Sequence, residues 1–194
     1  MELTDEHVAF FRDQGYLLLQ GVLDPDLCAR ARDRLWASLP QSSRIQRDDP
    51  STYTGPFDDA DLDPDVQNLR QGFRWQLRTC GPEQLLVDLV FSDTLQQIAE
   101  SLLGEGTLRR PKVGGSAMGS HGPAWPGGPV DPALDVDGAR GIYATLPYGD
   151  KPREKDLCHT DGHPFNLGLV GLIDDVPPDG GAFKIWPGSH RRLY

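Results

Sequence analysis

The sequence has few cysteines, no long apolar run and no excess of positive charge. Its three cysteines, Cys28, Cys80 and Cys158, form an odd, sparse set without a Cys-x-x-Cys pair, which excludes a disulfide framework. Reduced thiols and the lack of a basic stretch followed by an apolar run at the N-terminus together predict a cytoplasmic protein without a secretory signal. No apolar run approaches membrane-spanning length, so no membrane partner is expected.

The charge balance is strongly acidic. The 194 residues carry a formal net charge of -10, which disfavours nucleic acid and anionic membranes as partners and is typical of a surface that keeps the protein soluble. The length suits one domain with a sizeable core. High counts of Gly (22) and Pro (17) argue against a helical bundle, and nothing in the sequence fixes the oligomeric state.

The order of patterns predicts helices first and strands later within a single domain, 1–194. Residues 1–104 are expected to be mostly helical, 105–141 irregular, and 142–194 the first strands of a β core. Residues 40–72 have the composition of a long loop that could cover a site as a lid. The expected helices cover residues 5–14, 25–39, 82–91 and 93–103, and the expected strands cover 16–19, 142–146, 157–162, 167–173 and 182–186. The fold class predicted is α+β with a mainly β core.

His159 and Asp161 are the best candidates for metal ligands. On an extended strand, alternate side chains point to the same side, about 6 to 7 Å apart. An imidazole and a carboxylate are two of the three ligand types of mononuclear iron(II) sites. The alternative is that His159 is a polar strand residue hydrogen-bonded to Asp161. The next part of the chain, namely an apolar strand, a Gly-rich turn and Pro187-Gly188-Ser189-His190, favours the metal site.

That order of blocks resembles the phytanoyl-CoA dioxygenase family of iron(II)- and 2-oxoglutarate-dependent oxygenases. The resemblance covers about half the chain. Besides residues 158–190, it includes these N-terminal and central blocks: Leu3-Thr4, Phe10-Phe11, Asp13, Gly15-Tyr16, Gly21-Val22-Leu23 and the segment 92–104 that ends in Leu102-Leu103-Gly104. Residues 40–80 and 105–141 match no pattern of that family.

The resemblance implies a double-stranded β-helix of the jelly-roll or cupin-like kind, flanked by N-terminal helices. It implies Fe(II) as cofactor, 2-oxoglutarate and O2 as co-substrates, and hydroxylation of a small organic or acyl substrate. His159 and Asp161 fall on the family's first two iron ligands, and the carboxylate of Asp161 favours hydroxylation over halogenation. The family's third ligand, a His, and its 2-oxoglutarate-binding Arg would fall past Tyr194. The resemblance therefore implies a fragment, or a shortened member that lacks the C-terminal part.

Several other residues are candidates, each with an alternative beside it. Tyr143 and Thr145 share one face of the strand at 142–146 and either contact the co-substrate or face solvent. His190 could be the third ligand but fits a turn residue better, while His163 could line the site entrance. Trp186 is expected in the barrel wall. The basic residues before the motif either meet an anionic substrate or belong to a solvated loop; they are Arg140, Lys151, Arg153 and Lys155.

Two other functions remain open at this point. One is a jelly-roll module that binds a ligand without turnover, which the early end of the chain favours. The other is a cupin-type enzyme that uses a different divalent metal, with His159, Asp161 and His190 as ligands.

Overall fold

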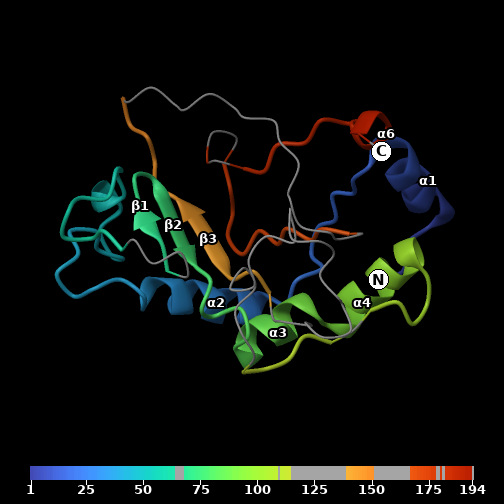
Figure 1. Cartoon of the computed structure of the whole chain (residues 1–194), viewed down its shortest axis with the longest axis horizontal. Helices are drawn as coiled ribbons and strands as arrows, with labels where there is room; N and C mark the ends of the chain where they lie inside the picture. Colours follow the sequence, from blue (N-terminus) through green and yellow to red (C-terminus); the bar gives the residue numbers. More distant parts are fainter. Residues whose placement is uncertain are drawn as a thin grey trace, which may run out of the picture.

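The computed structural model describes residues 1–63, 68–108, 110–114, 139–150, 167–177, 180 and 182–193. Within these ranges, the helices are α1 (Asp5–Gln14), α2 (Pro25–Trp36), the 3-10 helix η1 (Pro50–Thr52), α3 (Gln84–Val90), α4 (Asp93–Leu103) and α6 (His190–Leu193). The strands are β1 (Arg70–Gln71), β2 (Arg74–Leu77) and β3 (Ile142–Thr145). The small sheet lies at one end with α2 and α3 along one side of it, and α1, α4 and α6 lie toward the other end (Figure 1).

The first helix begins and ends where the sequence predicts. The Thr4 side chain accepts a hydrogen bond from the backbone N–H of His7, and the His7 ring bonds back to the Thr4 N–H, which makes a capping box. At the other end, Gly15 takes a left-handed conformation (φ 81°) and its N–H donates to the Phe11 carbonyl. Glycine adopts this conformation without the steric cost that a Cβ would add. The helix predicted over 5–14 is therefore confirmed.

The second helix is also confirmed at its start, although it ends earlier than expected. Asp24 accepts hydrogen bonds from the N–H groups of Asp26 and Leu27, and Pro25 occupies the first turn. The helix ends at Trp36 rather than at residue 39. Past its end, Ser38 turns back and donates from both its N–H and its hydroxyl to the Leu35 carbonyl. These local bonds compete with further helical turns.

Helices α3 and α4 follow one another with a short break. The predicted helix over 82–91 is observed as Gln84–Val90, and the N–H of Phe91 closes it onto the Val87 carbonyl. Ser92 then caps α4 by accepting from the Leu95 N–H, and Gly104 ends it. Both predicted helices are confirmed, with the first one shorter at its ends.

The sheet has the order β1-β2-β3, and both pairs are antiparallel. Gly72 (φ 58°) and Phe73 connect β1 to β2 as a two-residue hairpin loop, for which glycine at the first central position is favoured. Neither β1 nor β2 is among the expected strands: β1 lies in residues 40–72, which have the polar composition of a loop, and β2 follows directly after them. The strand expected at 142–146 is confirmed as β3, one residue shorter.

Two glycines allow β3 to lie beside β2. A Cβ on Gly141 would come 2.1 Å from the Leu77 carbonyl oxygen, and one on Gly81 would come 1.9 Å from the Ala139 carbonyl oxygen. No side chain fits at these distances. The backbone of 139–141 therefore lies against 77–81, which brings together parts of the chain that are about sixty residues apart.

The core lies between the inner face of the sheet, α2 and α3, at the end of the molecule remote from α1 and α6 (Figure 1). Helix α2 contributes Cys28, Ala31 and Leu35. An aromatic cluster extends the core toward η1: Trp75 is in edge-on contact with Trp36 and Phe57, and Trp36 contacts Tyr53. Helix α1, by contrast, has no buried residue, so the N-terminal helix adds little to this core.

Residues 40–63 form an ordered segment rather than an open loop. The Arg44 guanidinium donates to the carbonyls of Thr52 (3.3 Å) and Pro56 (2.7 Å). Arg70, which is mostly buried, donates to the carbonyls of Asp61 (2.8 Å) and Ser38 (3.2 Å). Because this segment has little regular structure, these carbonyl oxygens have no partner in a helix or sheet. The arginine side chains supply the missing hydrogen bonds.

Three predicted strands differ from the structure. Residues 16–19 have no regular secondary structure and pair with no strand among the described residues, and Leu18 is 78% exposed. Residues 167–173 and 182–186 are likewise not strands, and they expose the apolar side chains Leu169, Val170, Leu172, Phe183, Ile185 and Trp186. An apolar run forms a strand only where a neighbouring strand is available to pair with it. The strand predicted at 157–162 lies outside the described residues, and the double-stranded β-helix stays a prediction.

Over the part of the chain that the structure describes, every helix is too short or too polar to cross a membrane.

Candidate functional site

The two predicted iron ligands, His159 and Asp161, lie outside the described residues. The same holds for His163 and for the basic residues Lys151, Arg153 and Lys155. Their assignment as ligands or entrance residues therefore stays a prediction. The structure does place the strand that precedes them in sequence, β3, and the residues beside it.

Tyr143 and Thr145 lie on the outward face of the sheet. Along β3, the buried Ile142 and the partly buried Ala144 alternate with the exposed Tyr143 and Thr145. The cross-strand partner of Thr145 is Arg74, and that of Tyr143 is Gln76. The two predicted co-substrate contacts are thus on one face, as expected, together with the polar residues of β2. In the described part of the chain, that face is open to solvent.

Arg78 binds the Tyr143 hydroxyl. Its Nε donates to Tyr143 Oη at 3.2 Å, and its guanidinium carbon is 5.9 Å from the centre of the Tyr143 ring. The hydrogen bond defines this contact, because at 5.9 Å the cation–π attraction is at the edge of its range. Arg78 comes just after the end of β2, and this bond holds its guanidinium beside Tyr143 on the outward face.

The sequence patterns considered above do not single out Arg74 and Arg78. A signal is nevertheless present in residues 73–78, where the apolar Phe73, Trp75 and Leu77 alternate with polar residues. That period of two is the pattern of a half-buried strand. It predicts that both arginines lie on the solvent side of a strand, and the pairing of β2 with β3 then brings them beside Tyr143 and Thr145.

His190 is part of the contact between the two ends of the chain. Its ring lies against Gly15, and its Nε2 is 3.2 Å from the Arg12 carbonyl oxygen at the end of α1. Its Nδ1 is buried and has no hydrogen-bond partner among the described residues. Arg191 forms an ion pair with Asp13 in the same contact. That pair holds the pKa of Asp13 below its usual value, mainly through the hydrogen bond from Arg191.

This position favours the turn interpretation of His190 over the ligand interpretation. The bond between His190 Nε2 and the Arg12 carbonyl fixes the ring at the end of α1. There the ring helps to pack α6 against α1. Within the described ranges there is no group of three His, Cys, Asp or Glu side chains arranged to hold a metal ion.

Trp186 does not lie in a barrel wall. Its side chain is 44% exposed, and its backbone carbonyl accepts from the Ser189 N–H in the turn that leads to α6. The prediction that it packs in a wall is therefore wrong for this structure. The turn itself, at residues 187–189, lies where Pro187-Gly188-Ser189 predicts one.

The two described cysteines do not form a reactive site. Cys28 and Cys80 are free and buried. Burial raises the pKa of the Cys80 thiol to about 11, and the Glu83 charge acts in the same direction. Burial also raises the pKa of the Cys28 thiol. Both thiols are therefore protonated at neutral pH and unsuited to nucleophilic catalysis.

An open hollow of about 510 Å³ lies between the N-terminus and α4. Its lining includes three glutamates, Glu2, Glu100 and Glu105. One of them, Glu100, already accepts a hydrogen bond from the Gly106 N–H. The hollow contains none of the predicted site residues.

No family model, no curated protein and no solved structure matches this chain.

Proposed function

We propose that the chain is an iron(II)- and 2-oxoglutarate-dependent dioxygenase, or the ligand-bearing part of one, that hydroxylates a small organic or acyl substrate. The observation that carries the proposal is the order of sequence blocks: His159-Thr160-Asp161, an apolar segment, a Gly-rich turn and Pro187-Gly188-Ser189-His190. Each block alone is common, whereas their order is what the resemblance to the phytanoyl-CoA dioxygenase family depends on.

The donor atoms fit the proposed cofactor in type. Iron(II) of this class is held by two imidazoles and one carboxylate on one side, with open positions for the other reactants. His159 would supply one imidazole and Asp161 the carboxylate. When bound, iron activates O2 at the expense of 2-oxoglutarate, which gives succinate and carbon dioxide. The protein's part is to hold the metal and orient the substrate.

The described residues support the proposal in two limited ways. Tyr143 and Thr145 share the polar face of β3, the strand that precedes the motif, and their hydroxyls could bind a co-substrate carboxylate. The bond between His190 and the Arg12 carbonyl counts against the cupin-type alternative, which needs His190 as a metal ligand. We also propose a cytoplasmic location, supported by the two free, buried thiols.

The first test measures the affinity of the whole chain for Fe(II) by calorimetry under anaerobic conditions. Asp161→Ala is expected to weaken binding by about tenfold or more, because it removes a ligand outright. Asp175→Ala is the matched control, because Asp175 is an exposed aspartate outside the motif. This variant should bind Fe(II) normally. His190→Ala should also bind normally. Equal Fe(II) affinity in Asp161→Ala and in the unmodified chain would contradict the proposal.

The second test measures succinate released from 2-oxoglutarate under air with Fe(II). Release that depends on Asp161 would establish turnover. Tight Fe(II) binding that requires Asp161, without any succinate, would instead identify a module that binds ligand but does not turn over. Loss of Fe(II) binding in His190→Ala would favour the cupin-type site.

A further inference from the structure

The outward face of the sheet is basic in a protein that is acidic overall. Residues 68–82 and 139–149, which include all three described strands, contain four arginines and no Asp or Glu. The whole chain, in comparison, has 29 acidic residues against 19 basic ones. Arg74 and Arg78 are the two that lie on the outward face with Tyr143 and Thr145. Arg70, by contrast, lies opposite the buried Trp75 and is itself mostly buried.

Arg74 and Arg78 also differ from most other arginines in their contacts. Seven described arginines form ion pairs with Asp or Glu; they are Arg32, Arg34, Arg44, Arg47, Arg70, Arg110 and Arg191. Arg74 has no polar partner among the described residues, and Arg78 has only the Tyr143 hydroxyl there. The positive charges of Arg74 and Arg78 are thus not neutralised by carboxylates of the described residues.

The Arg78–Tyr143 bond prepares donors for a ligand. Because Arg78 uses Nε for this bond, the four N–H groups on its two terminal nitrogens stay available. Tyr143 accepts in that bond, so its own O–H can donate. Arg74 and Thr145 are directly opposite each other across the β2–β3 pair, which adds a second guanidinium and a second hydroxyl on the same face.

We propose that Arg74, Arg78, Tyr143 and Thr145 form a binding site for a small anion that carries a carboxylate or phosphate group. A planar guanidinium matches both groups with paired hydrogen bonds, which are among the stronger ones in proteins. The donor side chains come from the outward face of the β2–β3 pair, so the pairing of the two strands fixes their positions relative to one another. The inference shares Tyr143 and Thr145 with the co-substrate contact of the proposed function, but it does not rest on that function, since anion binding here requires no metal.

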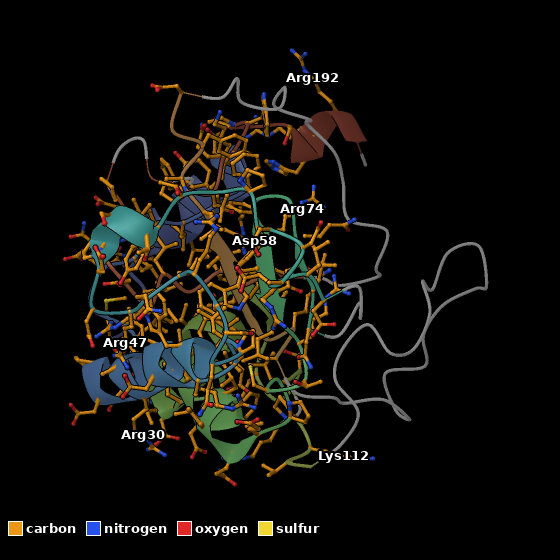
Figure 2. All side chains as sticks on the ribbon, turned by 90° about the vertical axis from the view of Figure 1, so that its left-hand side faces the viewer. Arg30, Arg47, Asp58, Arg74, Lys112 and Arg192 are labelled. Atoms are coloured by element: carbon orange, nitrogen blue, oxygen red, sulfur yellow. The ribbon has the colours of Figure 1, made fainter. Side chains whose placement is uncertain are left out.

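The exposed Arg30 on α2 provides a matched control. Like Arg74, it has no ion-pair partner among the described residues. Unlike Arg74, it lies on a helix and not opposite a hydroxyl side chain of a paired strand. Figure 2 shows Arg30 and Arg47 on the side of the molecule occupied by α2, with Arg74 across from them over the sheet. A general attraction of anions to exposed arginines would affect Arg30 and Arg74 alike, whereas a built site would not.

The experiment is a titration of the whole chain, with a chelator present and the ionic strength kept constant by NaCl. Glutarate and inorganic phosphate are the two probes, and NMR follows the arginine Nε–Hε signals. Saturable shifts of the Arg74 and Arg78 signals are expected. Arg78→Gln should weaken binding about tenfold, the loss of roughly one charge-assisted hydrogen bond. Arg30→Gln should leave binding unchanged.

Tyr143→Phe tests the positioning part of the proposal. It keeps the ring but removes the hydroxyl that holds Arg78, so anion affinity should fall while the thermal midpoint changes little. Tighter binding of glutarate would identify a carboxylate ligand, and tighter binding of phosphate a phosphorylated one. The proposal is overturned if the shifts do not saturate, or if Arg30→Gln reduces affinity as much as Arg78→Gln. Because no iron is present, this outcome is independent of the dioxygenase test.

Discussion

Asp61 is the least well satisfied residue of the described structure. Its side chain is fully buried, and neither carboxylate oxygen has a hydrogen-bond partner among the described residues. Only its backbone is engaged: its N–H donates to Asp58 and its carbonyl accepts from Arg70. A buried polar group without partners costs about 1 to 3 kcal/mol, and a charged one costs more. Asp61 therefore lowers the stability of the segment that it helps to form.

Asp61→Asn is expected to raise the free energy of unfolding by about 1 kcal/mol or more, because an uncharged amide of the same shape replaces a buried carboxyl group that has no hydrogen-bond partner. The measurement is urea unfolding at neutral pH. Asp59→Asn, an exposed neighbour, is the matched control and should change stability by less than about 0.5 kcal/mol. A clear loss of stability in Asp61→Asn would show instead that the carboxylate holds a cation or a water that supports the fold.

Among the elements, α1 and α6 depend on one another. Helix α1 buries no residue of its own, and α6 has only four residues. Their contact includes the His190 ring against Gly15, its Nε2 bonded to the Arg12 carbonyl, the bond from Gly188 N–H to the Gln14 carbonyl, and the Arg191–Asp13 pair. Gly15 serves two purposes in it, since it ends α1 and leaves room for the ring.

Gly15→Ala is expected to destabilise the protein more than Gly21→Ala. Both glycines have positive φ (81° and 67°), so an alanine costs about 1 to 2 kcal/mol at either position. A Cβ at Gly15 would also come 2.4 Å from His190 Nδ1, whereas one at Gly21 meets nothing within 4 Å. The measurements are thermal unfolding and amide hydrogen exchange over residues 188–193.

The double variant Gly15→Ala/His190→Ala separates the two causes. Removing the ring should recover the extra loss and leave only the backbone cost, as a double-mutant cycle would report. Equal effects of Gly15→Ala and Gly21→Ala would mean that α6 does not dock on α1 as described.

The helices are largely predictable from sequence because their signals are local. Thr4, Asp24 and Ser92 each cap a helix, and Gly15 and Gly104 each end one. The strands are less predictable, because a strand needs a partner elsewhere in the chain. The apolar residues 167–173 suggest a strand but have none to pair with in the described structure, whereas Arg74–Leu77 is short and polar on one face yet pairs on both edges.

The candidate site is predictable only in part, for the same reason. The His159-x-Asp161 motif is visible in the sequence, since its spacing carries the chemistry. The approach of Arg78 to Tyr143 is not visible there. It depends on the pairing of β2 with β3, which Gly81 and Gly141 permit through contacts between distant segments.

On the scale of the whole molecule, the buried Cys80 thiol couples stability to alkaline pH. Its pKa is about 11 in the folded protein, against an ordinary value of 9.0. The unfolded chain therefore loses this proton first as the pH rises. The stabilising contribution is fully present below pH 9 and is lost as the pH approaches 11. Two pKa units correspond to roughly 2 to 3 kcal/mol.

We therefore expect the free energy of unfolding to fall more steeply between pH 9 and 11 in the unmodified chain than in Cys80→Ala. Urea unfolding at several pH values gives both slopes, and subtracting them removes the contribution of Tyr and Lys residues common to both proteins. Cys28→Ala should have a similar effect in direction, since burial also raises that pKa. Identical slopes in the unmodified chain and Cys80→Ala would contradict the burial of Cys80.

The aromatic cluster around Trp75 provides the molecule with an optical reporter. Trp75 is only 3% exposed and its ring nitrogen donates to the Ser38 hydroxyl, while Trp186 is 44% exposed near the start of α6. A collisional quencher such as acrylamide reaches the second indole but not the first. The fraction of emission that acrylamide cannot quench therefore reports whether the core around Trp75 is still closed.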